Sequence, residues 1–181
     1  MTEGWGMVAA AAIALMGVFS GLFIGRRQVR DQAQVEHGQW LRGQRQEAYV
    51  NLIAAWDEAV PRFWDEILEH EQIYHIDQDD AWDEARVGAQ ATMDSARAPL
   101  RRAAERVQML GPDEVDEAVH QMLVTVQKMC NAIDSQYSSA VSHPEAFAGF
   151  ERALQETADR RKAFLAASRS ALRQTPDTGR S

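Results

Sequence analysis

The chain is 181 residues long, 45% of them hydrophobic and 25% charged, with a formal net charge of -8. This acidic excess argues against nucleic acid as a partner, because phosphate binding requires a basic surface. The single cysteine, Cys130, has no second thiol with which to form an internal disulfide, which agrees with a reducing cytoplasm.

The N-terminal region contains an apolar run. Residues 5–25, WGMVAAAAIALMGVFSGLFIG, are 21 residues without a charge. As a helix they would be about 31 Å long, which matches the hydrocarbon core of a bilayer. A cleavable secretory signal has Lys or Arg before its apolar part, whereas here the charge before the run is Glu3. The sequence therefore predicts an uncleaved transmembrane helix over residues 5–25.

Basic residues follow this run directly. Arg26, Arg27 and Arg30 come after it and no basic residue precedes it. Because Lys and Arg favour the cytoplasmic side, this bias predicts that residues 1–4 lie outside and that the rest of the chain is cytoplasmic, attached to the plasma membrane. Trp5 then lies at the outer interface, where aromatic rings are enriched.

Three glycines occur at four-residue intervals in the predicted membrane helix. Gly17, Gly21 and Gly25 would lie on one helix face, where missing side chains let two backbones approach closely. The sequence thus predicts self-association of the chain through this face. The alternative interpretation is that glycine is common in membrane helices and that residues 5–25 serve only as an anchor.

A polar segment separates this run from the remaining apolar stretches. We expect residues 26–46 to continue the helix as a stalk, with Gly38 and Gly43 as its flexible points. Residues 47–173 are then expected to form a cytoplasmic helical bundle, and residues 174–181, QTPDTGRS, a disordered tail.

The stretch QWLRGQRQEAYVNLIAAWDEA, residues 39–59, resembles the region just after the anchor in single-pass membrane proteins of actinobacteria whose role is not known. The resemblance covers about a ninth of the chain. It implies an anchored helical protein, and it implies no catalytic residues.

Apolar residues recur at three- and four-residue spacing after the stalk, and strand signals are weak throughout. A first stripe continues through Pro61, where we expect a kink rather than a helix end. A second, from about Asp80 to Leu110, ends at Gly111-Pro112. The predicted core positions are Ile53, Trp56, Val60, Phe63, Ile67 and Tyr74 in the first stripe, and Ala89, Met93, Ala96, Leu100, Ala103, Val107 and Leu110 in the second.

Two further stripes follow. One has an acidic first turn, as a helix N-terminus prefers, and ends near Tyr137. The last begins near Pro144, because proline suits the first turn of a helix. Their predicted core positions are Val115, Val119, Met122, Val126, Met129 and Ile133, and then Phe147, Phe150, Leu154, Leu165 and Leu172. The predicted fold class is all-α, with a transmembrane helix continuing through the stalk into an antiparallel up-down four-helix bundle.

Motifs for catalysis and metal binding are weak. Glu117 and His120 have the Glu-x-x-His spacing of di-metal bundles, but the motif occurs once and Glu117 should face solvent. His70 and His75 each follow a Glu at four residues, a spacing that suits zinc if further ligands converge and that equally suits helix-surface pairing. Residues 77–80, DQDD, lack the glycine and the glutamate of a calcium loop and suit helix capping. No phosphate loop, Cys-x-x-Cys pair or nucleophile elbow occurs. We expect no enzyme activity, cofactor or metal.

Charged and aromatic residues segregate along the chain. Residues 57–84 hold eleven acidic side chains and one Arg, while basic residues gather later. Either helix dipoles or attraction of the later bases to an anionic leaflet would explain this. Most aromatic residues should lie in the half of the bundle away from the membrane. The candidate ligand surface there comprises Trp56, Trp64, Trp82, His70, His75 and Asp79.

Two functions are compatible with these features. One is an anchored interaction or scaffold protein that binds the bilayer, assembles as a homo-oligomer and presents its bundle to a protein partner. The other is a membrane-tethered sensor or effector that binds a ligand at the aromatic and acidic surface, since aromatic faces beside carboxylates can hold a cation.

Overall fold

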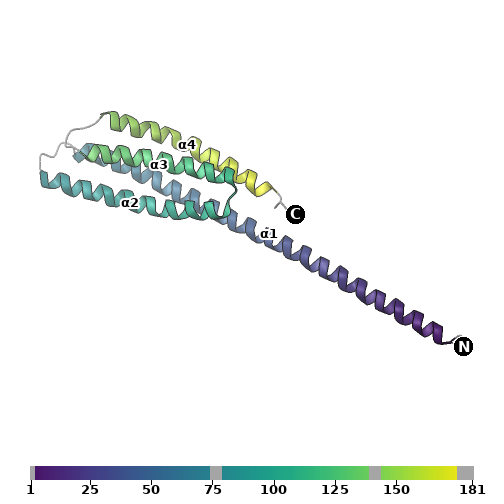
Figure 1. The fold of residues 1–181 in the computed structure, drawn as a ribbon. Coiled ribbons are helices and arrows are strands. Elements are labelled where there is room, and N and C mark those ends of the chain that lie inside the picture. The colour runs from purple at the N-terminus through teal and green to yellow at the C-terminus, as the bar shows by residue number, and fades with distance from the viewer. Residues whose placement is uncertain (1–2, 74–78, 139–143, 175–181) are drawn as a thin grey trace. The chain divides into compact units, whose positions relative to one another are not determined.

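The computed structural model (Figure 1) describes the backbone of residues 3–73, 79–138 and 144–174, and the side chains of residues 32, 35–69, 82–138 and 145–174. The described backbone forms four helices and contains no strand. They are α1 (Glu3–Ile73), α2 (Asp79–Leu110), α3 (Asp113–Tyr137) and α4 (Pro144–Arg173). The chain divides into two compact units, residues 1–42 and residues 43–181. The all-α prediction is confirmed for these residues.

The first unit contains the beginning of α1. Its described side chains make local contacts: Gln32 Nε2 donates to Glu36 Oε1 at 3.2 Å, and the rings of His37 and Trp40 stack at 5.8 Å. No helix that is long and apolar enough to cross a membrane is found among the described residues. The predicted membrane segment, residues 5–25, lies outside the described side chains, so the transmembrane helix stays a prediction.

The second unit is a four-helix bundle made by residues 43–73 of α1 together with α2, α3 and α4. Successive helices run in opposite directions (Figure 1), and α3 packs against both α2 and α4. This is the up-down arrangement that the four apolar stripes predicted. We call the end that holds Gly43 and the α2–α3 turn the basal end, and the opposite end the distal end.

The predicted face of α3 is confirmed, and that of α2 is confirmed at five of its seven positions. All six α3 positions from Val115 to Ile133 are at most 3% exposed. On α2 the structure buries Ala104 completely, whereas the predicted Ala103 and Leu110 are only partly buried. Ala104 replaces Ala103 because adjacent residues share the edge of a broad apolar face, and Leu110 is the last residue of α2.

The face of α1 is rotated slightly from the prediction. The helix is continuous through Pro61, which is exposed. Trp56, Phe63 and Ile67 are in the core as predicted, but Ile53 and Val60 are only partly buried. The buried hydrophobic positions that the prediction missed are Ala48, Tyr49, Leu52 and Ala59. Tyr74 lies outside the described residues.

The face of α4 differs most from the prediction. Phe150 is buried, but the other predicted positions, Phe147, Leu154, Leu165 and Leu172, are only partly buried. The fully packed side chains are instead Ala153, Phe164 and Ala171. Between Ala153 and Phe164 the core-facing side of the helix carries half-buried polar residues, including Thr157 and Arg160, and these interrupt the apolar pattern.

The α2–α3 turn is short and tightly packed. The Gly111 amide donates to the Val107 carbonyl at 2.7 Å, and the Pro112 carbonyl accepts from the amides of Val115 and Asp116. A Cβ atom added at Gly111 would lie 2.9 Å from the Val107 carbonyl oxygen. Glycine is therefore required here by close approach to the backbone, although its φ is not positive.

The glycines of the bundle predict opposite effects of alanine substitution. A Cβ at Gly88 or Gly149 would meet nothing within 4 Å, so Gly88→Ala and Gly149→Ala should each stabilise the bundle by up to about 1 kcal/mol. Gly111→Ala should destabilise it, because backbone must shift. Urea unfolding followed by circular dichroism measures all three, and a stabilising Gly111→Ala would contradict this account of the turn.

Candidate functional site

The predicted distal ligand surface is only partly assembled. Trp56 is 2% exposed and packs in the core, so its inclusion in a surface was wrong. Trp64 and Trp82 are half-buried. The side chains of His70, His75 and Asp79 lie outside the described residues. Of the predicted surface, the two half-buried tryptophans therefore remain as described candidates.

The predicted membrane residues belong to the part of α1 for which the structure describes the backbone alone. They are Gly17, Gly21, Gly25, Trp5, Arg26, Arg27 and Arg30. Their roles in association and topology stay predictions.

The two half-buried tryptophans each contact an aromatic ring on another helix. The Trp64 ring lies 6.1 Å from the Phe150 ring, and the Trp82 ring lies 5.9 Å from the Tyr137 ring, both in tilted orientations. Such ring pairs stabilise packing beyond the area that they bury. Part of each indole remains exposed, so the distal half presents aromatic surface to solvent.

A buried hydrogen bond lies beside Trp82. Tyr137 Oη donates to Glu66 Oε1 at 3.0 Å, and the two residues are 3% and 6% exposed. Burial and the neighbouring Glu66 charge raise the pKa of Tyr137 far above its usual value, so the phenol stays protonated and remains a donor. The Glu66 position continues the buried α1 face from Phe63, and that spacing is the signal that could have revealed this carboxylate.

The seam between α2 and α3 contains two hollows that share Asp94. The first, of about 450 Å³, is lined by Leu100, Leu123 and Val126 together with Arg97. The second, of about 530 Å³, reaches Ala89, Met93 and Asp134 at the distal end. Small side chains on α2, such as Ala91 and Ala98, leave this space open. Val87 on its rim is 65% exposed.

Charged groups lie along this seam. Arg97 Nη2 donates to Gln127 Oε1 at 2.7 Å across the two helices. Burial raises the pKa of Asp134, the Arg97 charge lowers it and the Asp94 charge raises it. Burial also raises the pKa of the Cys130 thiol to about 11, so the thiol is protonated at neutral pH. Because the thiolate is the reactive form, the folded chain offers no cysteine nucleophile at this position.

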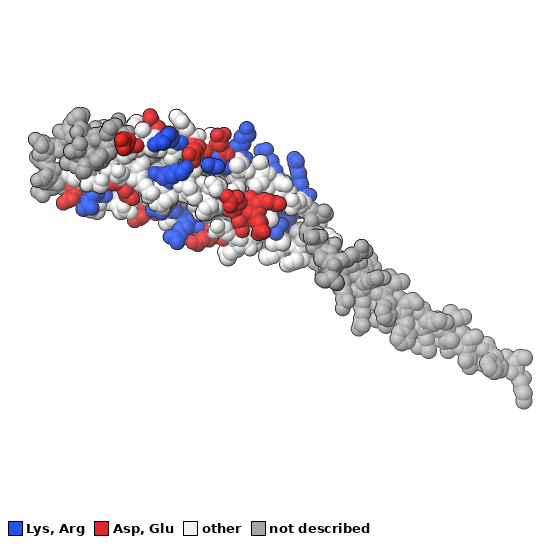
Figure 2. Space-filling view, turned by 45° about the horizontal axis from the view of Figure 1, so that its top comes forward, with Lys and Arg blue, Asp and Glu red and all other residues white. Residues whose placement is uncertain are grey.

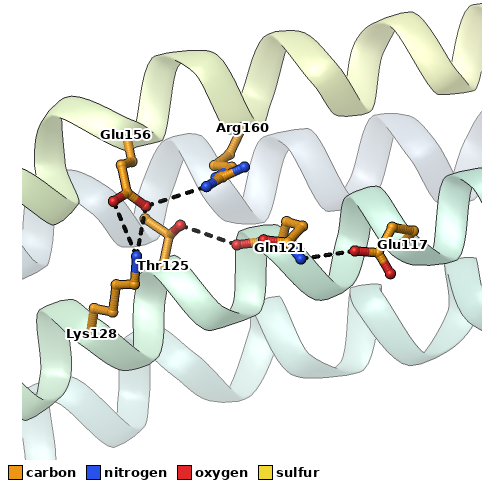
Figure 3. Close-up of polar contacts among 6 residues, drawn as sticks. All are labelled: Glu117, Gln121, Thr125, Lys128, Glu156 and Arg160. Carbon is orange, nitrogen blue, oxygen red and sulfur yellow. Dashed lines mark hydrogen bonds and ion pairs between the residues drawn. The ribbon is translucent and has the colours of Figure 1, made fainter.

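The seam between α3 and α4 is polar on its outer side (Figure 3). Lys128 Nζ donates to both carboxylate oxygens of Glu156 at 3.0 and 2.9 Å, and Arg160 lies 3.6 Å from the same carboxylate. The Lys128 hydrogen bond is the main reason that the pKa of Glu156 is lowered. These groups are partly exposed, so each pair contributes little to stability. They fix the register of the two helices, and Lys128 and Glu156 line a hollow of about 560 Å³ on this side of the bundle.

The Glu-x-x-His motif is on the outside of α3, as predicted. Glu117 and His120 are both exposed, and Glu117 Oε1 accepts a hydrogen bond from Gln121 Nε2 at 2.8 Å (Figure 3). No cluster of three or more His, Cys, Asp or Glu side chains suited to a metal ion occurs among the described residues.

Acidic and basic side chains are interspersed on the visible face of the bundle (Figure 2). Several of the later basic residues pair with earlier acids. The Arg161 guanidinium donates two hydrogen bonds to the Asp57 carboxylate, both at 2.8 Å, and Arg106 lies 3.3 Å from Glu47. These contacts join α1 to α4 and to α2, so they account for part of the charge segregation without reference to a lipid surface.

The two buried tyrosines offer a matched prediction. Tyr137→Phe leaves the Glu66 carboxylate without its tyrosine donor and should destabilise the bundle by about 2 kcal/mol. Tyr49→Phe removes a buried hydroxyl that has no hydrogen-bond partner among the described residues, so it should be neutral or stabilise by about 1 kcal/mol. Urea unfolding midpoints measure both, and equal effects of the two substitutions would refute this distinction.

Comparison of the chain with protein-family models, with curated proteins and with solved structures finds no match. The site is thus characterised by its own geometry: partly exposed aromatic rings over a buried Glu66 at the distal end, and an open α2–α3 seam along the bundle. Both features offer surface and space for the binding of another molecule.

Proposed function

We propose that this chain is a single-pass, membrane-anchored helical interaction protein that self-associates through Gly17, Gly21 and Gly25. The observation that carries the proposal is the run of 21 uncharged residues followed by Arg26 and Arg27. Such a run suits a membrane span, and its basic flank favours a cytoplasmic bundle in the plasma membrane. In this proposal residues 26–46 are a spacer, and the bundle is the part that meets a protein partner.

The bundle supports an interaction role through its surface. The α2–α3 seam combines an apolar floor, with Leu100 and Val126, and polar side chains on its rim. Grooves of this kind accept an amphipathic helix, since apolar anchors fill the floor and charged groups set orientation. No enzymatic activity is part of the proposal, which rests here on the absence of catalytic motifs from the sequence.

The glycine face is tested in a membrane dimerisation assay that uses the full chain with a reporter fused after Ser181. The reporter responds only if it is cytoplasmic and brought together with a second copy. Gly21→Ile should abolish most of the signal, because a branched side chain separates the two backbones. Leu22→Ile, on another face, should leave the signal unchanged.

The possible failures of this assay have different meanings. A wild-type chain that gives no signal, and whose reporter is accessible to a protease outside intact cells, would refute the predicted cytoplasmic orientation. An equal signal from Gly21→Ile and Leu22→Ile would refute the glycine face and leave residues 5–25 as an anchor alone.

The second candidate function is a tethered ligand sensor. One observation in the distal half of the bundle supports it. Half-buried Trp82 lies against Tyr137, and Tyr137 holds the buried Glu66 carboxylate. Aromatic faces near a carboxylate suit a cationic ligand. This candidate predicts that amines or basic peptides change the tryptophan fluorescence of the chain and that Trp82→Phe reduces the change. An unchanged spectrum across such a panel would exclude it.

A further inference from the structure

Three of the four buried side-chain atoms that make no hydrogen bond among the described residues lie at the basal end of the bundle. They are Tyr49 Oη, Asp116 Oδ1 and Ser168 Oγ, and the fourth is Arg160 Nε, about two turns before Ser168 on α4. Tyr49 and Ser168 are 4% and 5% exposed. Tyr49 lies on α1, Asp116 on α3 and Ser168 on α4, so three helices each contribute one unsatisfied atom at this end. We call these three residues the basal polar layer.

The register of the helices places the three residues at one level. Lys128 on α3 pairs with Glu156 on α4. Asp116 precedes Lys128 by twelve residues and Ser168 follows Glu156 by twelve, so the two are opposite in antiparallel helices. The Tyr49 ring meets the Phe164 ring edge-on at 5.8 Å, one helical turn from Ser168. The layer therefore lies across the bundle interior, near the α2–α3 turn.

The layer weakens the interior at this end. A buried polar atom without a partner loses its hydration and gains no bond in exchange. Burial raises the pKa of both Tyr49 and Asp116, although the nearby Arg45 charge lowers that of Tyr49. At the distal end, by contrast, the buried Glu66 and Tyr137 satisfy each other.

The basal end of α1 is instead held from outside by two arginines. Arg45 Nε donates to the Leu110 carbonyl at 2.6 Å and so caps the C-terminus of α2. Arg106 donates to Gln44 Oε1 at 3.2 Å and lies 3.3 Å from Glu47 Oε1. These contacts are partly solvent-accessible, and water can replace them at small cost.

We propose that the basal end is a release joint, at which residues 44–52 of α1 separate from α3 and α4 while the distal half stays packed. Separation breaks the hydrogen bonds of Arg45 and Arg106, and water replaces them. It also brings water to the polar atoms of the basal polar layer, which make no hydrogen bond while the helices are packed. Opening is thus less costly here than at the distal end, as in local unfolding of native proteins. The joint is independent of the membrane proposal, because every residue that forms it belongs to the bundle.

The joint has a direct functional meaning. α1 is the helix that continues toward the N-terminus, and residues 44–52 belong to its first turns within the second unit. Release would expose the apolar side of α1, including Ala48 and Leu52, together with the surfaces that they cover.

The joint is tested by the labelling rates of two buried cysteines on α1. In full-length chain carrying Cys130→Ala, Ala48→Cys tests the basal end and Ala59→Cys is its matched control, since the two alanines are 0% and 1% exposed. Under native conditions Ala48→Cys should react with a thiol reagent at least about tenfold faster. Equal rates would overturn the proposal, because both sites would then open only by global unfolding.

Further substitutions test whether the basal polar layer causes the basal end to open. Adding Tyr49→Phe and Ser168→Ala should slow labelling of Ala48→Cys severalfold and leave Ala59→Cys unchanged, whereas Arg45→Gln should accelerate labelling of Ala48→Cys alone. If removal of the two hydroxyls does not slow basal labelling, the layer is not the cause and the proposal fails. Should Ala48→Cys not fold, amide hydrogen exchange of the wild-type chain at residues 45–52 and 59–67 makes the same comparison, and equal protection overturns the proposal.

Discussion

The bundle depends on burial of one face of α3. Its six apolar side chains from Val115 to Ile133 are at most 3% exposed, and they are the surface against which α2 and α4 pack. Full burial of side chains of this size contributes roughly 1.5–3 kcal/mol each, which exceeds what any surface ion pair in the bundle supplies. The Lys128–Glu156 and Arg161–Asp57 contacts therefore set register on a structure that apolar burial already holds.

Polar groups are distributed unequally between the two ends. At the distal end the buried carboxylate of Glu66 has a donor in Tyr137, so polarity there specifies one packing arrangement. At the basal end Tyr49 and Ser168 are buried without such partners among the described residues. Because the buried polar groups are hydrogen-bonded at the distal end and not at the basal end, local stability falls from the distal to the basal end of the bundle. Helix α1 spans both ends.

Sequence periodicity predicted the fold because each helix carries its own apolar pattern. The α3 face was correct at all six positions, since apolar residues recur regularly along it even though the polar Thr125 is buried beside them. The α4 face was wrong around Phe164, because Thr157 and Arg160 occupy core-facing positions and conceal the pattern. Contacts between helices, such as that of Arg45 with the Leu110 carbonyl, were not predictable. They depend on how two helices meet, and the spacing within one helix carries no information about that.

The burial of Cys130 restricts the covalent chemistry open to an assembled form of the chain. A thiol that is 1% exposed, with its pKa raised to about 11, cannot reach a second thiol while the bundle is folded. Even on the oxidising side of a membrane, folded copies would not become cross-linked through it. A disulfide-linked dimer in a preparation would instead identify chains that had opened before they met, so the cysteine serves as an intrinsic record of unfolding.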